Sequence, residues 1–340
     1  DWYNRTTSDI LTTANLPATL GADAPYENMG TIQTKGWELA IDYRHTFKNG
    51  LHFGVTASVA DDKTEVTKWT YNTKIPSYGA TGWWDKSAYK EGMVLGDIWG
   101  LQFDRFLTED DFNADGSLKA GLPDQTKVFP AGYQFAPGDV LYKDLDNNGE
   151  IVKQTNTNDK GDLSVIGNAL PRLQFGLNLD AAWKGFDISM FFQGVAKRKL
   201  WAAGNQVLPG FTTGEPFYKG AEDYWTPENT DAFYPRPMDY KQSASGNYSV
   251  NDRYLLNMAY LRLKTFTVGY SLPKVWLSKF KVQGLRVYFT GENLFTIDGV
   301  KPAIDPEIGI RTASGKSDQR NFGRSYPYQK TVSFGIQLSL

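Results

Sequence analysis

The chain has 340 residues, a formal net charge of −2, no cysteine and an aromatic content of 14%. This length allows one large all-β domain or two smaller domains, and the near-neutral charge gives no signature of a nucleic-acid partner. The lack of cysteine excludes thiolate catalysis, disulfide bonds and cysteine-rich metal sites. No run approaches the roughly 18 apolar residues of a membrane-spanning helix. The chain opens at Asp1 without a leader, and we expect it to be a piece of a longer protein.

Alternation of apolar and polar residues predicts β-strands in several stretches. These stretches are 37–47, 51–59, 173–183, 186–193, 285–290 and 331–340. A period of two places one set of side chains on each face of a strand. In the last stretch the apolar set is Val332, Phe334, Ile336, Leu338 and Leu340. Such a face fits a transmembrane β-barrel with lipid outside and a polar lumen inside, and by itself it also fits a soluble sandwich.

The segment 259–271 changes phase part-way along. Leu261 and Leu263 hold one phase of the alternation, whereas Phe266 and the apolar residues after it hold the other. One extra residue in a strand has this effect. We therefore expect a β-bulge near Lys264.

The connections between the predicted strands fall into two classes. The short ones are 47–50, 184–185 and 272–284, and the long ones are about 12–35, 61–171, 196–258 and 294–327. Counting back from the last strand, every short connection falls on one side of the sheet. Outer-membrane barrels have short periplasmic turns and longer extracellular loops, and a soluble sandwich has no reason to sort its loops in this way. The sequence predicts an all-β fold, a transmembrane antiparallel β-barrel with long extracellular loops.

An acidic turn at 144–151 is the strongest candidate for a ligand site. Its oxygen-bearing side chains are those of Asp144, Asp146, Asn148 and Glu150. Oxygens at positions 1, 3 and 5 with glycine at position 6 match the first half of an EF-hand loop, which binds calcium. Position 12, however, is Thr155, where calcium loops carry a carboxylate. The pattern predicts a structural Ca²⁺ site, and a solvated Asp/Asn turn is the alternative.

The long loops are rich in aromatic residues. The candidates for substrate or partner binding are Trp83, Trp84, Trp201, Tyr224 and Trp225. Exposed aromatic faces near polar side chains suit stacking against sugars or contact with a protein partner. Long loops also pack on themselves, which is the competing interpretation of each of these residues.

The two histidines, His45 and His52, flank the turn at 47–50. We interpret them as interfacial or lumenal residues. The chain contains no Gly-x-Ser-x-Gly, no P-loop and no His-Glu-x-x-His motif. The sequence therefore predicts no enzyme activity.

A series of short phrases, in a fixed order along nearly the whole chain, carries a family resemblance. They include Asn28-Met29-Gly30, Lys35-Gly36-Trp37-Glu38, Pro137-Gly138-Asp139, Lys143-Asp144-Leu145-Asp146-Asn147-Asn148-Gly149, Ile166-Gly167-Asn168, Lys184-Gly185-Phe186-Asp187, Phe192-Gln193-Gly194-Val195, Tyr260-Leu261-Arg262-Leu263-Lys264, Glu292-Asn293-Leu294-Phe295, Asp305-Pro306-Glu307 and Tyr326-Pro327. In their order and spacing they resemble the C-terminal barrel region of the SusC/RagA-like TonB-dependent transporters of Bacteroidetes outer membranes.

The resemblance implies the architecture. Residues 1–340 would be the C-terminal part of a 22-stranded barrel, about eight strands, with the plug domain and earlier strands absent. In the family the acidic loop runs on to an acidic residue just before an Ile-Gly. Here that implies Asp162 as a further Ca²⁺ ligand, with Asp159 as a second candidate.

The resemblance also implies the function. The protein would be a multi-pass outer-membrane importer of oligosaccharides or peptides. A SusD-like lipoprotein would form its lid, and TonB would drive it through the absent N-terminal region. The aromatic loops favour a glycan cargo, and a dimer of transporter–lid pairs is expected. The alternative is a complete small outer-membrane barrel with a structural or adhesive role.

Overall fold

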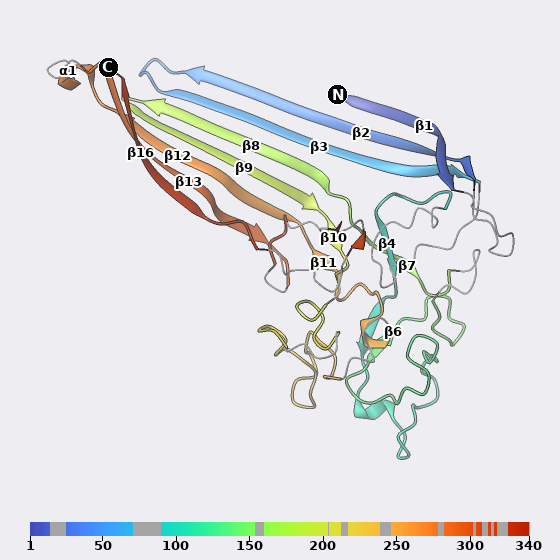
Figure 1. Cartoon of the computed structure of the whole chain (residues 1–340). Coiled ribbons are helices and arrows are strands. Elements are labelled where there is room, and N and C mark those ends of the chain that lie inside the picture. The colour runs from blue at the N-terminus through green and yellow to red at the C-terminus, as the bar shows by residue number, and fades with distance from the viewer. Residues whose placement is uncertain are drawn as a thin grey trace.

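An eight-stranded antiparallel sheet dominates the fold (Figure 1). The computed structural model describes residues 1–13, 25–70, 90–153, 160–202, 204–211, 217–238, 246–277, 282–301, 304–307, 312–313, 316–317 and 326–339. In spatial order the strands are β1 (Trp2–Thr13), β2 (Tyr26–Thr46), β3 (His52–Trp69), β8 (Arg172–Trp183), β9 (Phe186–Lys197), β12 (Tyr260–Ser271), β13 (Gly284–Asp298) and β16 (Thr331–Ser339). Each strand pairs with the next strand of this sheet along the chain, so the sheet is an antiparallel meander.

The register gives the sheet one apolar and one polar face. One row of paired residues on the apolar face runs through Ala181, Ile188, Val268, Phe289 and Phe334. The adjacent row on the other face runs through Asp180, Ser189, Thr267, Thr290 and Ser333. Directly opposed residues share a face of a sheet, so these rows extend the alternation seen within each strand across the strands. The predicted period of two is confirmed.

The three short connections lie at one end of the sheet, and the first two are tight turns. In the first, the Gly50 N–H donates to the Phe47 carbonyl at 2.9 Å, and Gly50 has a φ of +81°. In the second, Lys184 and Gly185 both have positive φ, as a two-residue type I′ hairpin requires. The third contains the short helix α1 (Lys274–Leu277). Figure 1 shows α1 and the carboxyl end of the chain at the end of the sheet opposite the long loops.

The bulge in β12 is confirmed. Its register with both neighbouring strands shifts between Leu263 and Thr265, which leaves Lys264 as the extra residue. The expected extents of three long connections were wrong. β2 begins at Tyr26, β3 runs to Trp69 and β13 runs to Asp298. The strand ends continue to pair with their neighbours although their residues do not alternate between apolar and polar. Strand ends that lie beyond the apolar face of the sheet do not need apolar side chains on one side.

The long connections fold together beyond one end of the sheet. We call the described parts of residues 90–170, 198–258 and 299–307 the loop assembly. Its small two-stranded sheets pair β4 (Asp97–Gly100) with β7 (Ser164–Asn168), β5 (Phe103–Phe106) with β6 (Val140–Tyr142), and β10 (Lys199–Leu200) with β11 (Leu256–Asn257). Short 3-10 turns lie at Glu109–Asp111 and Gly246–Tyr248, and β14 (Thr312–Ala313) pairs with β15 (Lys316–Ser317) in a later connection.

Two hydrophobic cores hold the loop assembly together. One gathers around Leu200, Leu208 and Met258, and the other around Tyr142 and Ile151. All five side chains are almost completely buried. Within the described residues, no helix is both long and apolar enough to cross a bilayer.

Candidate functional site

The acidic loop that follows β6 is closed by its own side chains. The Asp144 Oδ2 accepts a hydrogen bond from the Gly149 N–H at 2.8 Å, and the Asp146 Oδ1 accepts one from the Asn148 N–H at 3.1 Å. Asn147 and Gly149 both adopt positive φ, at 58° and 85°. These are residue types that tolerate left-handed backbone, so the sequence favours this sharp turn.

Asp162 reaches the same loop from the chain that enters β7. It is fully buried, and its two oxygens accept hydrogen bonds from the Leu145 and Val152 N–H groups, both at 2.8 Å. One carboxylate oxygen from each of Asp144, Asp146 and Asp162 lies within 4.8 Å of the others. The structure thus brings together three of the five residues expected to bind Ca²⁺, including the one that lies farthest along the chain.

The side chains of the other two expected ligands, Asn148 and Glu150, form contacts with other protein groups. The Asn148 amide donates to Asp146 Oδ2 at 3.1 Å, and its oxygen accepts the Glu150 N–H at 2.8 Å. The Glu150 carboxylate pairs with Lys127. At position 7 an EF-hand loop uses the backbone carbonyl, so this pairing does not remove a ligand of that kind. The alternative candidate, Asp159, lies outside the described residues.

The electrostatics of this cluster fit a divalent cation. Asp144 Oδ1 is buried and has no hydrogen-bond partner among the described residues. Burial raises the pKa of the Asp144 carboxyl, but the backbone N–H groups that face it, Gly149 first, outweigh this and hold its pKa below the usual value. Negative charges this close repel one another, and a cation between them removes that repulsion. Hard oxygen ligands in this number are those that Ca²⁺ prefers.

The predicted aromatic residues fall into three groups. Trp83 and Trp84 lie outside the described residues. Trp201 and Trp225 are buried in the two cores of the loop assembly, so their faces pack against protein. Tyr224 is exposed, and together with Phe217 and Tyr218 it lines a groove of about 670 Å³. A role for Tyr224 in binding stays a prediction.

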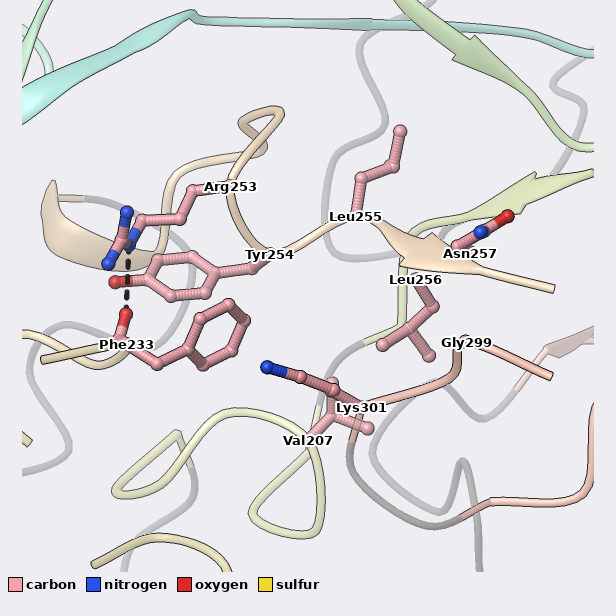
Figure 2. Close-up of a pocket in the computed structure, with 9 residues that line it drawn as sticks. All are labelled: Val207, Phe233, Arg253, Tyr254, Leu255, Leu256, Asn257, Gly299 and Lys301. Atoms are coloured by element: carbon pink, nitrogen blue, oxygen red, sulfur yellow. Dashed lines mark hydrogen bonds between the residues drawn. The ribbon is translucent and has the colours of Figure 1, made fainter. Parts of the chain in front are cut away.

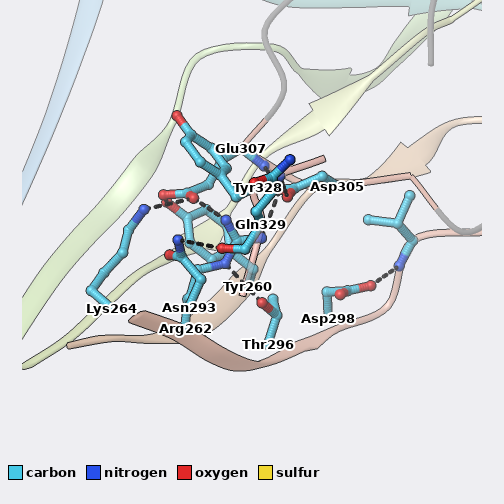
Figure 3. Close-up of polar contacts among 11 residues, drawn as sticks. Tyr260, Arg262, Lys264, Asn293, Thr296, Asp298, Asp305, Glu307, Tyr328 and Gln329 are labelled. Atoms are coloured by element: carbon cyan, nitrogen blue, oxygen red, sulfur yellow. Dashed lines mark hydrogen bonds and ion pairs between the residues drawn. The ribbon is translucent and has the colours of Figure 1, made fainter. Parts of the chain in front are cut away.

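A buried ion cluster fixes the segment after β13 to β12 (Figure 3). The Arg262 guanidinium donates to Asp305 at 2.7 Å and also pairs with Glu307. Lys264 donates to Glu307 at 2.8 Å, and the Tyr260 hydroxyl donates to the same carboxylate at 2.9 Å. Two cations balance two anions, as burial requires. Sequence reasoning missed this cluster, although its members lie in two of the phrases that carry the family resemblance.

A second buried ion pair ties the loop assembly to itself. Asp139 is fully buried and accepts from Arg236 at 2.8 Å, from Tyr133 at 2.8 Å and from Asn247 at 2.9 Å. The contacts with Arg236 and Asn247 join segments about 100 residues apart in the chain. The role is structural, because every Asp139 oxygen is occupied by a protein donor.

The histidines lie on opposite faces of the sheet, as expected. His45 packs edge-on against Phe47, with their ring centroids 4.6 Å apart. On the polar face the His52 Nε2 lies 3.8 Å from Asp180 and the Nδ1 contacts Thr46.

Known proteins resemble the chain over its whole length, although no family model matches it. It is 27% identical over 350 residues to TonB-dependent receptor P3 of Formosa agariphila, a match that covers 99% of the chain and 32% of the receptor. It is 22% identical over 349 residues to TonB-dependent receptor SusC of Bacteroides thetaiotaomicron, covering 100% of the chain and 29% of SusC. The resemblance to SusC/RagA-like TonB-dependent transporters is confirmed. The chain spans about a third of the length of these relatives.

Solved structures support the same fold. A structure of the RagAB peptide transporter matches with a TM-score of 0.67 at 20% identity, over 99% of this chain and 32% of that one. The RagAB peptide importer in its open-open state matches with a TM-score of 0.64 at 19% identity, over 100% of this chain and 32% of that one. The expected all-β barrel fold is confirmed, although the sheet of the described residues is open. The relatives are receptors and transporters, in line with the prediction that the chain is not an enzyme.

Proposed function

We propose that this chain is the C-terminal part of the barrel of a TonB-dependent nutrient importer in a bacterial outer membrane. The observation that carries the proposal is the sheet. Its apolar face is continuous across the strands, while its long connections gather at one end and its tight turns at the other. A barrel in a membrane explains both features, because lipid covers one face of the sheet and the long loops lie on one side of the membrane.

The open edges of the sheet favour the interpretation that this chain is part of a larger barrel, rather than a complete small barrel. Within the described residues β1 and β16 each pair on one side only. In lipid an unpaired strand edge leaves backbone N–H and C=O groups unsatisfied, which costs several kcal/mol per group. Further strands, in the same protein, would close the barrel. This favours the importer over the structural or adhesive alternative.

For the whole protein we propose an oligosaccharide or peptide cargo and a SusD-like lipoprotein lid. TonB would act through a plug domain that precedes these strands. The family resemblance implies the lid and the aromatic loops favour a glycan cargo, whereas RagAB is named as a peptide transporter. A dimer of transporter–lid pairs is part of the same proposal. The exposed aromatic residues around Tyr224 are the surface that we expect to contact cargo or lid.

We also propose that the acidic loop binds Ca²⁺ as a structural ion. Asp144, Asp146 and Asp162 would hold it, with oxygens of Asn148 and Glu150 completing the shell. The unpartnered Asp144 Oδ1 supports this. A bound ion would fix the chain that connects β6 to β7, because both ends of that connection contribute ligands.

The test of the importer is to purify the protein from its native outer membrane in detergent and identify everything that co-migrates by mass spectrometry. We expect a plug-bearing segment of the same transporter and a SusD-like lipoprotein, and a retained glycan or peptide would name the cargo class. A stable barrel formed by this chain alone would overturn the proposal and leave the structural or adhesive role.

A further inference from the structure

A small pocket lies in the loop assembly beside β11 (Figure 2). Its volume is about 170 Å³. The buried side chains of Tyr254, Leu256 and Val207 form its floor, while Lys301 and Asn257 are exposed at its mouth. A cavity of about 150 Å³ holds a benzene molecule. The pocket therefore has room for one six-membered ring or one amino-acid side chain.

The charges that line this pocket are all positive. They belong to Arg253 and Lys301, and none of the residues found to line the pocket is acidic. Neither cation forms an ion pair with a carboxylate among the described residues. Cations without an opposing carboxylate give the pocket a positive potential, which favours an anionic ligand.

Arg253 is a fixed part of the wall. Its Nε donates to the Phe233 carbonyl at 2.9 Å, as Figure 2 shows, and its Nη2 donates to the Ala232 carbonyl. The guanidinium also lies 4.3 Å from the centroid of the Phe103 ring. Carbonyls and aromatic faces stabilise its charge without neutralising it.

Lys301 is the available cation. Its ammonium lies 6.0 Å from the centroid of the Phe233 ring. The Arg253 guanidinium lies 5.5 Å from the same centroid. Within the described residues the Lys301 ammonium donates no hydrogen bond, so its three donors are open to a ligand. Two of the Arg253 nitrogens already donate to backbone carbonyls. The site therefore suits a ligand group with one negative charge better than a group with several.

We propose that this pocket binds the carboxylate of an anionic ligand. Lys301 is its ion partner, Arg253 supplies the supporting positive field, and the apolar floor receives the ring or chain that carries the carboxylate. A uronic-acid sugar and a peptide both offer that chemistry. The proposal rests on the proposed function only in taking the ligand to be part of the imported cargo.

The experiment measures binding to the assembly purified from native outer membranes, by calorimetry at low salt. The probes are two matched pairs, trigalacturonate with its trimethyl ester and N-acetyl-trialanine with its C-terminal amide. We expect the acid to bind at least tenfold more tightly than its neutral analogue in one pair, and that pair identifies the source of the carboxylate. Equal affinities within both pairs, or no binding of any probe at millimolar concentration, would overturn the proposal.

Substitutions then locate the binding to the pocket. Lys301 is exposed, so Lys301→Gln leaves the fold intact, and we expect it to reduce the preference for the acid to less than twofold, while Lys301→Arg retains it. The control is Lys119→Gln, because Lys119 is an exposed lysine of the loop assembly that lines neither this pocket nor the aromatic groove. An equal loss in Lys119→Gln would mean diffuse surface attraction and would also overturn the proposal.

Failure of this site is distinguishable from failure of the importer. The calorimetry reads only the contribution of the carboxylate to binding. The co-purification of plug and lid tests the importer without any anionic probe. If the plug and lid are found while acid and neutral probes bind alike, the importer stands and the pocket proposal falls.

Discussion

Phe334 in β16 is 83% exposed, whereas Phe211 in the loop assembly is 7% exposed. The same contrast holds between Ile336 on the sheet and Leu208 in the loops, which is completely buried. The sheet turns its apolar side chains outward, while the loop assembly packs them inward around two cores. Inward packing is what water requires, and an outward apolar face is stable only where lipid replaces water.

The two regions also differ in how they handle charge. On the polar face of the sheet, pairs such as Arg44 with Asp42 are more than half exposed. At the junction with the loops, Arg262, Asp305 and Glu307 are at most 10% exposed. A buried charge must be matched by a partner, whereas an exposed one need not be. The junction is therefore where single substitutions act most strongly.

Arg262→Met tests that junction and has the largest expected effect. It leaves the carboxylates of Asp305 and Glu307 buried with too little positive charge, a situation that costs about 3–5 kcal/mol. We expect a loss of this size in the free energy of unfolding, measured by denaturant titration of the purified assembly. The matched control is Arg44→Met, an exposed pair worth less than about 1 kcal/mol. Equal losses in the two variants would show that the junction does not anchor the loops.

Phe334→Lys tests whether the exposed face of β16 contacts lipid. A lysine on the lipid face of a barrel costs about 2–4 kcal/mol near the bilayer midplane. In water the same substitution at an exposed site changes stability by about 0.5 kcal/mol or less. Phe217→Lys is the control, because Phe217 is 58% exposed in the loop assembly. Similar small effects of both substitutions on unfolding would contradict the placement of the sheet in a membrane.

Seven of the eight strands of the sheet were predictable because their signal is local, whereas β1 (Trp2–Thr13) was not predicted from alternation. Alternation within a stretch such as 186–193 fixes the face of each residue, and the phase change beside Lys264 was enough to place the bulge. The ends of β2 and β3 were not predictable in this way. Residues 26–36 pair with β1 and β3 through backbone hydrogen bonds, which every sequence can form, so no alternation marks them.

The sites of the loop assembly depended on contacts between distant residues. Arg262 and Glu307 are 45 positions apart in the chain, and no local pattern links them. Asp162 was found only through the family resemblance, since an inserted stretch separates it from Asp144. The pairing of Glu150 with Lys127 was missed for the same reason. Side chains that meet across loops are set by the packing of the loops, which the sequence pattern does not encode.

Calcium should stabilise the loop assembly and leave the sheet unchanged. At a free Ca²⁺ concentration of 100 times Kd, binding to the folded state adds about 2.7 kcal/mol to the free energy of unfolding. We expect a higher Tm in Ca²⁺ than in chelator, and we expect Asp144→Asn to abolish the difference. Asp115→Asn is the matched control, because Asp115 caps a similar turn through the Ser117 N–H at 2.9 Å and is not one of the three clustered carboxylates. An equal Tm in Ca²⁺ and in chelator would contradict the Ca²⁺ site and support the alternative of a solvated Asp/Asn turn.

Acid should loosen the loop assembly at Asp111. The Arg105 guanidinium, which donates to Asp111 at 2.6 and 2.7 Å, lowers the pKa of that carboxyl to about 2. A folded-state pKa below the unfolded value means that the pair contributes fully above pH ~4 and is lost as the pH falls toward 2. Because Arg105 is 42% exposed, solvent screening reduces its contribution to about 1 kcal/mol.

Unfolding at pH 5 and at pH 2.5 measures this contribution. Asp111→Asn should lower the free energy of unfolding at pH 5, and its difference from the wild type should shrink at pH 2.5. The exposed neighbour provides the control, since Asp110→Asn should show little difference at either pH. A difference that stays constant between the two pH values would mean that Asp111 acts through its shape and its contacts with Thr108 rather than through its charge. The loops would then resemble the sheet, where exposed charges contribute little to stability.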